Sequence, residues 1–364
     1  MNFVIGTSSA DTITERFTSI GVVGSPGSGR DSITAGGGDD FISGGAGDDT
    51  IDGGDGIDTV AYSTAPAAVS VNLALGTARG GAGSDVLRFI ENVIGSNFAD
   101  SITGNKANNA LSGRTGNDTF FGSTGNDTID GGAGRDTANY SSLGQVVTLG
   151  ALGSLKKGTA GTDTLIGIET IVGSTRIGDT VDLSGASAAP ATGTVTNLTT
   201  GVVVVNGTAP LPLTFSVSQF ENVIGSGFAD SITGNKANNS LSGGLGNDTI
   251  DGGVGADTIT GGGGADQLTG SLGKDVFVYT ALTDSLLSNF DIITDYSVGD
   301  VLDRPGTGAT LNSSVGIASG LTAANLTSFL NSFIFTANAS RAFTAVGSTG
   351  TFIAFNDATA GFNA

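Results

Sequence analysis

The sequence predicts an all-β fold, a solenoid in which very short parallel strands stack on one another. Glycine- and aspartate-rich nonapeptides recur in phase over three long tracts, and the eighth position of every copy is apolar. The acidic residues support the same fold class. Of 34 in the chain only four are glutamate, and aspartate favours turns whereas glutamate suits the surfaces of helices.

Fifteen in-phase nonapeptides make up the three tracts, with four copies over residues 26–61, five over 95–139 and six over 225–278. Position six is Asp in 13 copies, with Asn109 and Asn239 as the exceptions, and position four is Gly in 11. Two looser copies lie at residues 6–14 and 158–166. A fixed period of this kind is the signature of repeat architectures, in which each unit is stabilised by its neighbours.

Each nonapeptide combines a turn with a strand. Glycines at positions one, two and four permit positive φ and close approach of the backbone, so the carbonyls of the turn can point inward. The last three residues form a minimal strand whose middle side chain faces the interior. Such a strand is unstable alone, but copies stacked about 4.8 Å apart pair their backbones and build a thin apolar core.

Stacking also places the position-six aspartates in a column of like charges. At a spacing of about 5 Å such a column repels itself strongly. A cation with many oxygen ligands resolves the repulsion, and Ca²⁺, which takes 6–8 oxygens at about 2.3–2.6 Å, suits these turns better than Mg²⁺. The sequence therefore predicts that multiple Ca²⁺ ions are the cofactors of the chain.

The alternative reading of any single aspartate is a turn former that hydrogen-bonds its own backbone. For the 13 phased aspartates we favour ligation, whereas both readings stay open for two aspartates of the looser copies, Asp11 and Asp163. Three aspartates at positions three or five are expected to face solvent: Asp39, Asp48 and Asp55. Three lysines of the tracts are expected to form salt bridges at the surface: Lys106, Lys236 and Lys274.

The pattern GGxGxDxUx, with U apolar, resembles the haemolysin-type, or repeats-in-toxin (RTX), calcium-binding repeat. The resemblance implies a right-handed parallel β-roll with two nonapeptides per coil. Each ion then lies between turns on the same face of successive coils, and its two aspartates come from nonapeptides n and n+2. The implied pairs are Asp31 with Asp49, Asp40 with Asp58, Asp100 with Asp118, Asp118 with Asp136, Asp230 with Asp248, Asp248 with Asp266, and Asp257 with Asp275.

The same resemblance assigns further residues to the metal sites. Asn109 would face Asp127 and Asn239 would face Asp257, which leaves those two sites weaker by one carboxylate. The implied turn glycines are Gly36, Gly38, Gly45, Gly47, Gly54, Gly56, Gly132, Gly134, Gly244, Gly246, Gly253, Gly255, Gly262 and Gly264. The position-four glycine is replaced in the first coils of tracts two and three, which are expected to lack ions there, by Phe98, Ala107, Phe228 and Ala237.

The tracts divide the chain in order. We expect a first repeat tract (1–61), a β-rich linker (62–94), a second tract (95–139), a degenerate repeat with a β-rich insertion (140–224), a third tract (225–278) and a C-terminal cap (279–364). Residues 91–113 recur at 221–243 with two differences, so duplication of a larger module built the chain. In the cap, residues 321–331 fit a short helix and 342–357 a hairpin.

After residue 278 the phrase D-x-I-x-D-x-x-x-G-D resembles the cap that closes the roll in the RTX family, and residues 276–362 as a whole resemble the C-terminal domain called bluetail in cyanobacterial repeat proteins. In such proteins the C-terminal end carries an uncleaved signal for type I export. The resemblance implies the type I secretion machinery as a partner and an extracellular location. The first residues show no basic segment followed by an apolar one, so we expect secretion without an N-terminal signal peptide.

Composition excludes several classes of function. The net charge of −20 argues against partners such as nucleic acid or an anionic membrane surface. The chain has no Cys and no His, which removes thiolate sites and the commonest general base. No apolar run approaches the roughly 20 residues that span a bilayer. We expect no catalytic residues and no organic cofactor.

Three functions stay open at this point. The favoured one is a secreted, calcium-loaded structural or adhesive protein whose extracellular partner is unspecified. The alternatives are a stand-alone carrier module for export and the C-terminal part of a secreted enzyme of the haemolysin or serralysin class.

Overall fold

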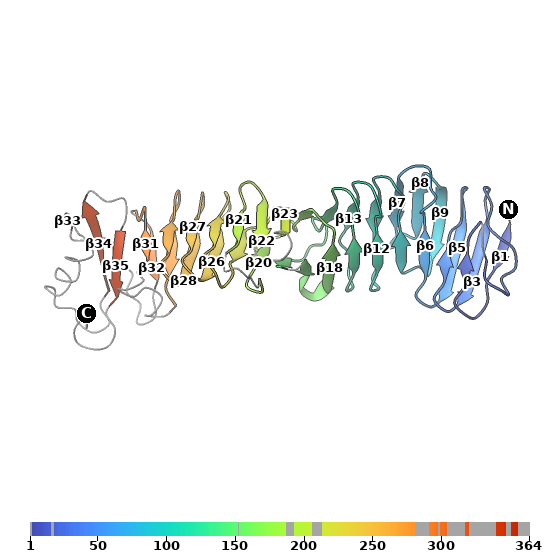
Figure 1. The fold of residues 1–364 in the computed structure, drawn as a ribbon, viewed down its shortest axis with the longest axis horizontal. Coiled ribbons are helices and arrows are strands. Elements are labelled where there is room, and N and C mark those ends of the chain that lie inside the picture. The colour runs from blue at the N-terminus through green and yellow to red at the C-terminus, as the bar shows by residue number, and fades with distance from the viewer. Residues whose placement is uncertain are drawn as a thin grey trace. The chain divides into compact units, whose positions relative to one another are not determined.

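The computed structural model describes residues 2–15, 18–151, 153–186, 193–205, 213–280, 291–297, 299–303, 317–319, 340–346 and 351–355 (Figure 1). The chain divides into two compact units, which are taken separately below. The first comprises residues 1–149, 153–179 and 215–219, and the second residues 150–152, 180–214 and 220–364. Within the described residues the elements are strands and one short 3₁₀ helix, η1 (Gly158–Ala160), without an α-helix, so the predicted all-β class is confirmed.

The first unit holds two rows of short strands that face each other. One row contains β1 (Phe3–Ile5), β3 (Ser32–Gly37), β5 (Thr50–Asp55), β7 (Val69–Asn72), β8 (Thr77–Gly80), β9 (Gly83–Arg88), β11 (Ser101–Thr103), β13 (Thr119–Phe121), β15 (Thr137–Asn139), β19 (Thr170–Val172) and β23 (Leu213–Ser218). The other contains β2 (Thr12–Ile13), β4 (Phe41–Ile42), β6 (Thr59–Ala61), β10 (Asn92–Ile94), β12 (Ala110–Ser112), β14 (Thr128–Asp130), β16 (Thr148–Gly150), β17 (Ser154–Lys156) and β18 (Thr162–Ile166).

The second unit is built in the same way. Its first row contains β21 (Val195–Asn197), β22 (Val202–Val205), β25 (Ser231–Thr233), β27 (Thr249–Asp251), β29 (Gln267–Thr269), β31 (Ile292–Ile293), β33 (Ile317–Ser319), β34 (Ser340–Val346) and β35 (Thr351–Phe355). Its second row contains β20 (Thr180–Asp182), β24 (Asn222–Ile224), β26 (Ser240–Leu245), β28 (Thr258–Gly263), β30 (Val276–Val278) and β32 (Val301–Asp303).

Parallel pairing fixes the coil at two nonapeptides. In the second unit Thr249 of β27 pairs with Gln267 of β29, and Thr258 of β28 pairs with Val276 of β30. Partners in the tracts are thus 18 residues apart, the same spacing that separates the bonded position-six residues. Because both strands of each coil return to the same register, every position-six residue lies above its counterpart in the next coil.

Two insertions extend single coils without breaking the stack. In the first unit β7, β8 and β9 pair antiparallel in sequence, and β9 then rejoins the parallel row beside β5, with Thr50 opposite Val86. The second insertion repeats the arrangement, because β16, β17 and β18 pair antiparallel and β18 rejoins beside β14, with Thr128 opposite Thr164. The first insertion therefore adds its antiparallel strands to the row, since β9 pairs with β5 on one side and β7 pairs with β11 on the other.

The core is the thin apolar layer that the repeat predicts. All fifteen position-eight residues are buried. Ile51 and Ile250, for example, have no exposed surface, and the weakest apolar member, Ala138, is also fully buried. Burial of one side chain per nonapeptide explains why the strands can be three residues long.

The C-terminal segment is described only in part. β34 and β35 pair antiparallel, with Ser340 opposite Phe355, as the predicted hairpin over 342–357 requires. The helix predicted at 321–331 lies outside the described residues. The six-segment division of the chain stays a prediction.

Candidate metal centre

Within each unit the position-six aspartates form ladders along the stacked turns, in which hydrogen bonds join successive coils. All 13 are buried although they carry charge and lie in turns. They share this environment with the two asparagines that replace aspartate, Asn109 and Asn239. An acidic side chain in a glycine-rich turn would ordinarily face water, so the burial is imposed by the stacking and not by the local sequence.

One carboxylate oxygen of each rung is used to bind the neighbouring coil. The backbone N–H of Asp248 donates to Oδ1 of Asp266 at 2.8 Å, and that of Asp257 donates to Oδ1 of Asp275 at 2.9 Å. The structure brings together all seven predicted pairs through this same bond, at 2.7–2.9 Å. These are charge-assisted bonds, and they set the register of the coils.

The second oxygen of many rungs has no partner. Seven buried Oδ2 atoms accept no hydrogen bond: those of Asp40, Asp49, Asp58, Asp118, Asp136, Asp248 and Asp257. A buried carboxylate oxygen without a donor is strongly unfavourable. Repeated in the same place on successive coils, it marks a position that a ligand is expected to fill.

The unpartnered oxygen lies close to a backbone carbonyl oxygen of the next coil, and we name this group of oxygens the inter-coil cradle. It consists of the Oδ2 atom of one turn and the position-one carbonyl of the next coil, both close to the position-one glycine. A Cβ added to Gly252 would lie 2.6 Å from Asp257 Oδ2 and 2.9 Å from the carbonyl oxygen of Gly270. At Gly252 any side chain would therefore collide with the oxygens of the cradle.

The glycines at positions two and four aim further carbonyls along the stack. All fourteen predicted turn glycines have positive φ, from 87° at Gly45 to 154° at Gly134. A Cβ on Gly45 would lie 2.6 Å from the carbonyl oxygen of Gly27, the position-two residue of the preceding coil. The position-two carbonyl of one coil thus points at the turn of the next.

Burial perturbs the acidity of the ladder. Desolvation raises the pKa of Asp49 and Asp248 from 3.8 to about 7, and neighbouring carboxylates raise it further while the backbone hydrogen bond lowers it. The same causes raise the pKa of Asp58, Asp118 and Asp257 to about 6. In the metal-free fold, burial therefore opposes ionisation of the ladder at neutral pH.

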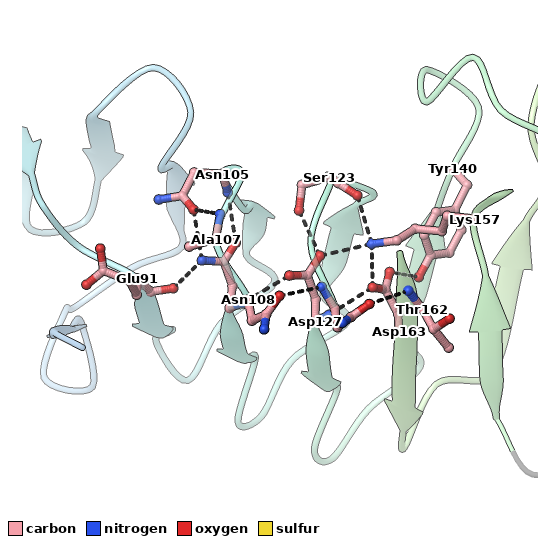
Figure 2. Close-up of polar contacts among 12 residues, drawn as sticks. Glu91, Asn105, Ala107, Asn108, Ser123, Asp127, Tyr140, Lys157, Thr162 and Asp163 are labelled. Carbon is pink, nitrogen blue, oxygen red and sulfur yellow. Dashed lines mark hydrogen bonds and ion pairs between the residues drawn. The ribbon is translucent and has the colours of Figure 1, made fainter. Parts of the chain in front are cut away.

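Where the repeat departs from its consensus, a hydrogen-bond donor of the protein either contacts the position-six carboxylate or takes its place. The backbone N–H groups of Ser96 and Ser226 donate to Oδ2 of Asp100 and of Asp230, at 2.5 Å and 2.6 Å, and the two hydroxyls donate to Oδ1 of the same carboxylates. Nδ2 of Asn109 donates to the carbonyl of Glu91 at 2.5 Å (Figure 2). These are the first coils of tracts two and three, which were expected to lack ions.

Several ladder residues lie outside the phased nonapeptides. Asp11 and Asp163 are buried rungs, since the N–H of Asp11 donates to Asp40 and that of Asp127 to Asp163. Sequence reasoning missed further rungs that accept the same bond, namely Asp85, Glu91, Glu169, Asp179, Asp291 and Asp300. For Asp85 the signal was the phrase GGAGSD, and for Asp291 and Asp300 the D-x-I-x-D-x-x-x-G-D phrase.

The aspartates and lysines that were predicted to lie at the surface are exposed, but the predicted salt bridges of the lysines are not seen in the part of the chain that the structure describes. Asp39, Asp48 and Asp55 are exposed, but Oδ1 of Asp39 also accepts the N–H of Ile57 at 2.9 Å. Position five of many coils forms this second, outer ladder, as when Asn108 Oδ1 accepts the N–H of Asn126 at 2.8 Å. Lys106, Lys236 and Lys274 are exposed, but the predicted salt bridges do not form within the described residues, where both ion pairs belong to Lys157.

The donor set suits a hard divalent cation. Each cradle offers carboxylate and carbonyl oxygens, and the chain contains neither His nor Cys to favour a softer metal. No group of three or more His, Cys, Asp or Glu side chains that could hold one metal ion together occurs in the part of the chain that the structure describes. An ion would therefore take two carboxylates and complete its shell with carbonyls, which is the ligation that calcium accepts. The same part of the chain holds no helix long and apolar enough to cross a membrane.

Comparison with known proteins identifies the repeat. The family model of the RTX calcium-binding nonapeptide repeat (4 copies) matches residues 26–60, 89–120, 103–138, 224–259 and 246–277. No curated protein matches the chain. The matched segments coincide with the three phased tracts, whereas the bluetail resemblance of residues 276–362 stays a prediction. The chain therefore carries RTX calcium-binding nonapeptide repeats, which support a calcium-binding repeat protein.

Proposed function

We propose that this protein is a secreted structural or adhesive repeat protein whose Gly–Asp turns bind several Ca²⁺ ions and whose β-roll folds when it meets calcium outside the cell. The observation that carries the proposal is the row of buried Oδ2 atoms without a partner, several of which lie beside a backbone carbonyl of the next coil. A cation in each cradle would satisfy the orphaned oxygen and neutralise the ladder.

The residues that would hold one ion can be named for the third tract. Asp257 Oδ2 and the carbonyl of Gly270 border the same cradle, and Asp275 is the carboxylate of the next coil. Bound calcium would supply positive charge between two like-charged rungs. The protein's own contribution is to bring these oxygens together at the coil spacing when the turns stack.

Calcium binding and folding are expected to be coupled. Ordering a chain with 62 glycines costs about 1–2 kcal/mol per residue in backbone entropy, and the ladders add repulsion between carboxylates. A thin core does not offset both, so binding free energy becomes folding free energy. Affinities of about 10⁻⁴–10⁻³ M, typical of extracellular modules, would leave the tracts unfolded in the cytoplasm and folded outside. An unfolded chain suits passage through a type I exporter.

Titration of the metal-free chain with calcium tests the coupling. Far-UV circular dichroism and the hydrodynamic radius should change together from an expanded coil to a compact β-rich state, and magnesium at the same concentration should be a poor substitute. A compact β-rich state that persists in excess chelator would contradict the proposal. Export can be tested separately, by expressing the chain with and without a type I exporter and measuring the amount in the medium.

A further inference from the structure

The turns that contain Asp127 and Asp163 differ from every other turn in the described residues, because a lysine lies inside them. Lys157 is fully buried, and its two ion pairs are the only salt bridges that the described part of the chain contains. It follows directly after β17 in the second insertion, and its neighbour Lys156 is exposed. An ammonium group is normally kept in water, so this burial needs a specific reason.

The ammonium group binds three oxygens (Figure 2). Nζ donates to the carbonyl of Ser123 at 2.8 Å, to Asp127 Oδ2 at 3.1 Å, and also to Asp163 Oδ1. Three donors and three acceptors match, so no N–H of the ammonium is left without a partner.

These three oxygens belong to the stacked turns themselves: a position-two carbonyl, a position-six Oδ2 of the kind that borders a cradle, and a carboxylate oxygen of the next rung. Ser123 is the position-two residue of its nonapeptide, and position-two carbonyls point at the next coil, as Gly27 does toward Gly45. Asp127 Oδ2 corresponds to the oxygen that has no partner in seven other rungs. Asp163 is the position-six rung of the next coil, since its Oδ1 also accepts the N–H of Asp127 at 3.0 Å.

A matched turn in the same unit shows what happens without the lysine. The first insertion returns to the stack at Asp85, whose Oδ1 accepts the N–H of Asp49 at 3.0 Å. Tyr62 donates to Asp85 Oδ2 at 3.0 Å, just as Tyr140 donates to Asp163 Oδ2 at 2.8 Å. Yet Asp49 Oδ2 has no partner, whereas Asp127 Oδ2 accepts from both Lys157 and the hydroxyl of Ser123.

We propose that the Lys157 ammonium is a tethered cation that takes the place of calcium between Asp127 and Asp163. This turn closes without metal and binds none, while the matched turn between Asp49 and Asp85 takes an ion. The inference rests on the proposed calcium binding of the other turns. Electrostatics makes the two occupants exclusive, because a divalent ion on the same oxygens would lie within a few ångströms of the ammonium charge.

Calcium stoichiometry of the full-length protein tests the inference. Lys157→Ala empties the turn and is expected to bind one more calcium ion per chain than the wild type, measured by equilibrium dialysis and by native mass spectrometry. Lys156→Ala, the exposed neighbour, should bind the wild-type number. If the wild type binds calcium and Lys157→Ala binds the same number, the inference is overturned while the proposed function stands. If none of the three proteins binds calcium, both are overturned.

A measurement on the wild type covers the case in which Lys157→Ala does not fold. Amide hydrogen exchange is compared with and without calcium, with the metal-free chain held folded by trimethylamine N-oxide. Calcium should slow exchange of the Asp49 and Val86 amides by more than about tenfold and change that of the Asp127 and Thr164 amides by less than about twofold. Both pairs of amides bond across their coils in the same way. Equal slowing in the two turns would overturn the inference.

Discussion

Asp257→Asn is predicted to stabilise the metal-free fold and to destabilise the calcium-bound fold. The substitution keeps the shape of a fully buried side chain and removes its charge. The ladder already contains an asparagine at position six. The rung bonded to Asp257 is Asn239, whose Nδ2 donates to the carbonyl of Glu221 at 2.6 Å. An amide at position 257 would likewise offer an N–H where the carboxylate has the unpartnered Oδ2.

The structure gives the size of both effects. In the metal-free fold burial raises the pKa of Asp257 from 3.8 to about 6, so ionisation at pH 8 opposes folding by at most about 3 kcal/mol. Relaxation around the charge reduces this, and we expect a gain of about 1–2 kcal/mol for the variant. Loss of one calcium site at about 100 times its dissociation constant costs about 2.7 kcal/mol.

Two titrations measure the stabilisation of the metal-free fold and the destabilisation of the calcium-bound fold separately. In chelator at pH 8, where the chain is expected to be unfolded, trimethylamine N-oxide is titrated and folding is followed by far-UV circular dichroism. Asp257→Asn should fold at a lower osmolyte concentration than the wild type. In saturating calcium it should unfold at a lower urea concentration, and Asp55→Asn, an exposed control, should match the wild type in both. Destabilisation of Asp257→Asn under both conditions would refute the ladder argument and leave Asp257 a turn former.

Three further outcomes are expected. Gly252→Ala places a Cβ 2.6 Å from Asp257 Oδ2 and should lose one calcium ion in calorimetry, whereas Gly263→Ala, which meets only a leucine side chain, should retain the wild-type number. The pKa of Asp49 and of Asp248 in the fold, about 7, lies above the unfolded value. The stability that these two carboxyl groups contribute to the metal-free fold should therefore be fully present below about pH 4 and be lost as the pH rises through 7. The osmolyte midpoint in chelator should therefore be lower at pH 5 than at pH 8, and equal midpoints would contradict it. Ile250→Ala should lose about 2–5 kcal/mol of stability in calcium and bind the same number of calcium ions per chain as the wild type. A different number of bound ions would mean that the core residue also affects the metal sites.

The sequence by itself determined the repeating part of this protein. A nine-residue period with glycine at fixed positions fixes where the chain turns, and one apolar side chain per period fixes which residue is buried. The pairing of Asp257 with Asp275 followed from the same period once two nonapeptides were assigned to a coil. These features are local or strictly periodic, so they can be read without knowing which distant segments meet.

Only the tertiary structure decided what happens where the period is interrupted. Asp163 could be a turn former or a ligand in the sequence, and its place in the ladder depends on an insertion that returns the chain to the stack 36 residues beyond Asp127. Lys157 reaches Asp127 across 30 residues through that same insertion. Nothing in its sequence neighbourhood distinguishes it from the exposed Lys156. The physical reason is that burial of a charge is set by the oxygens which long-range packing brings around it, and the nonapeptide pattern does not encode that packing.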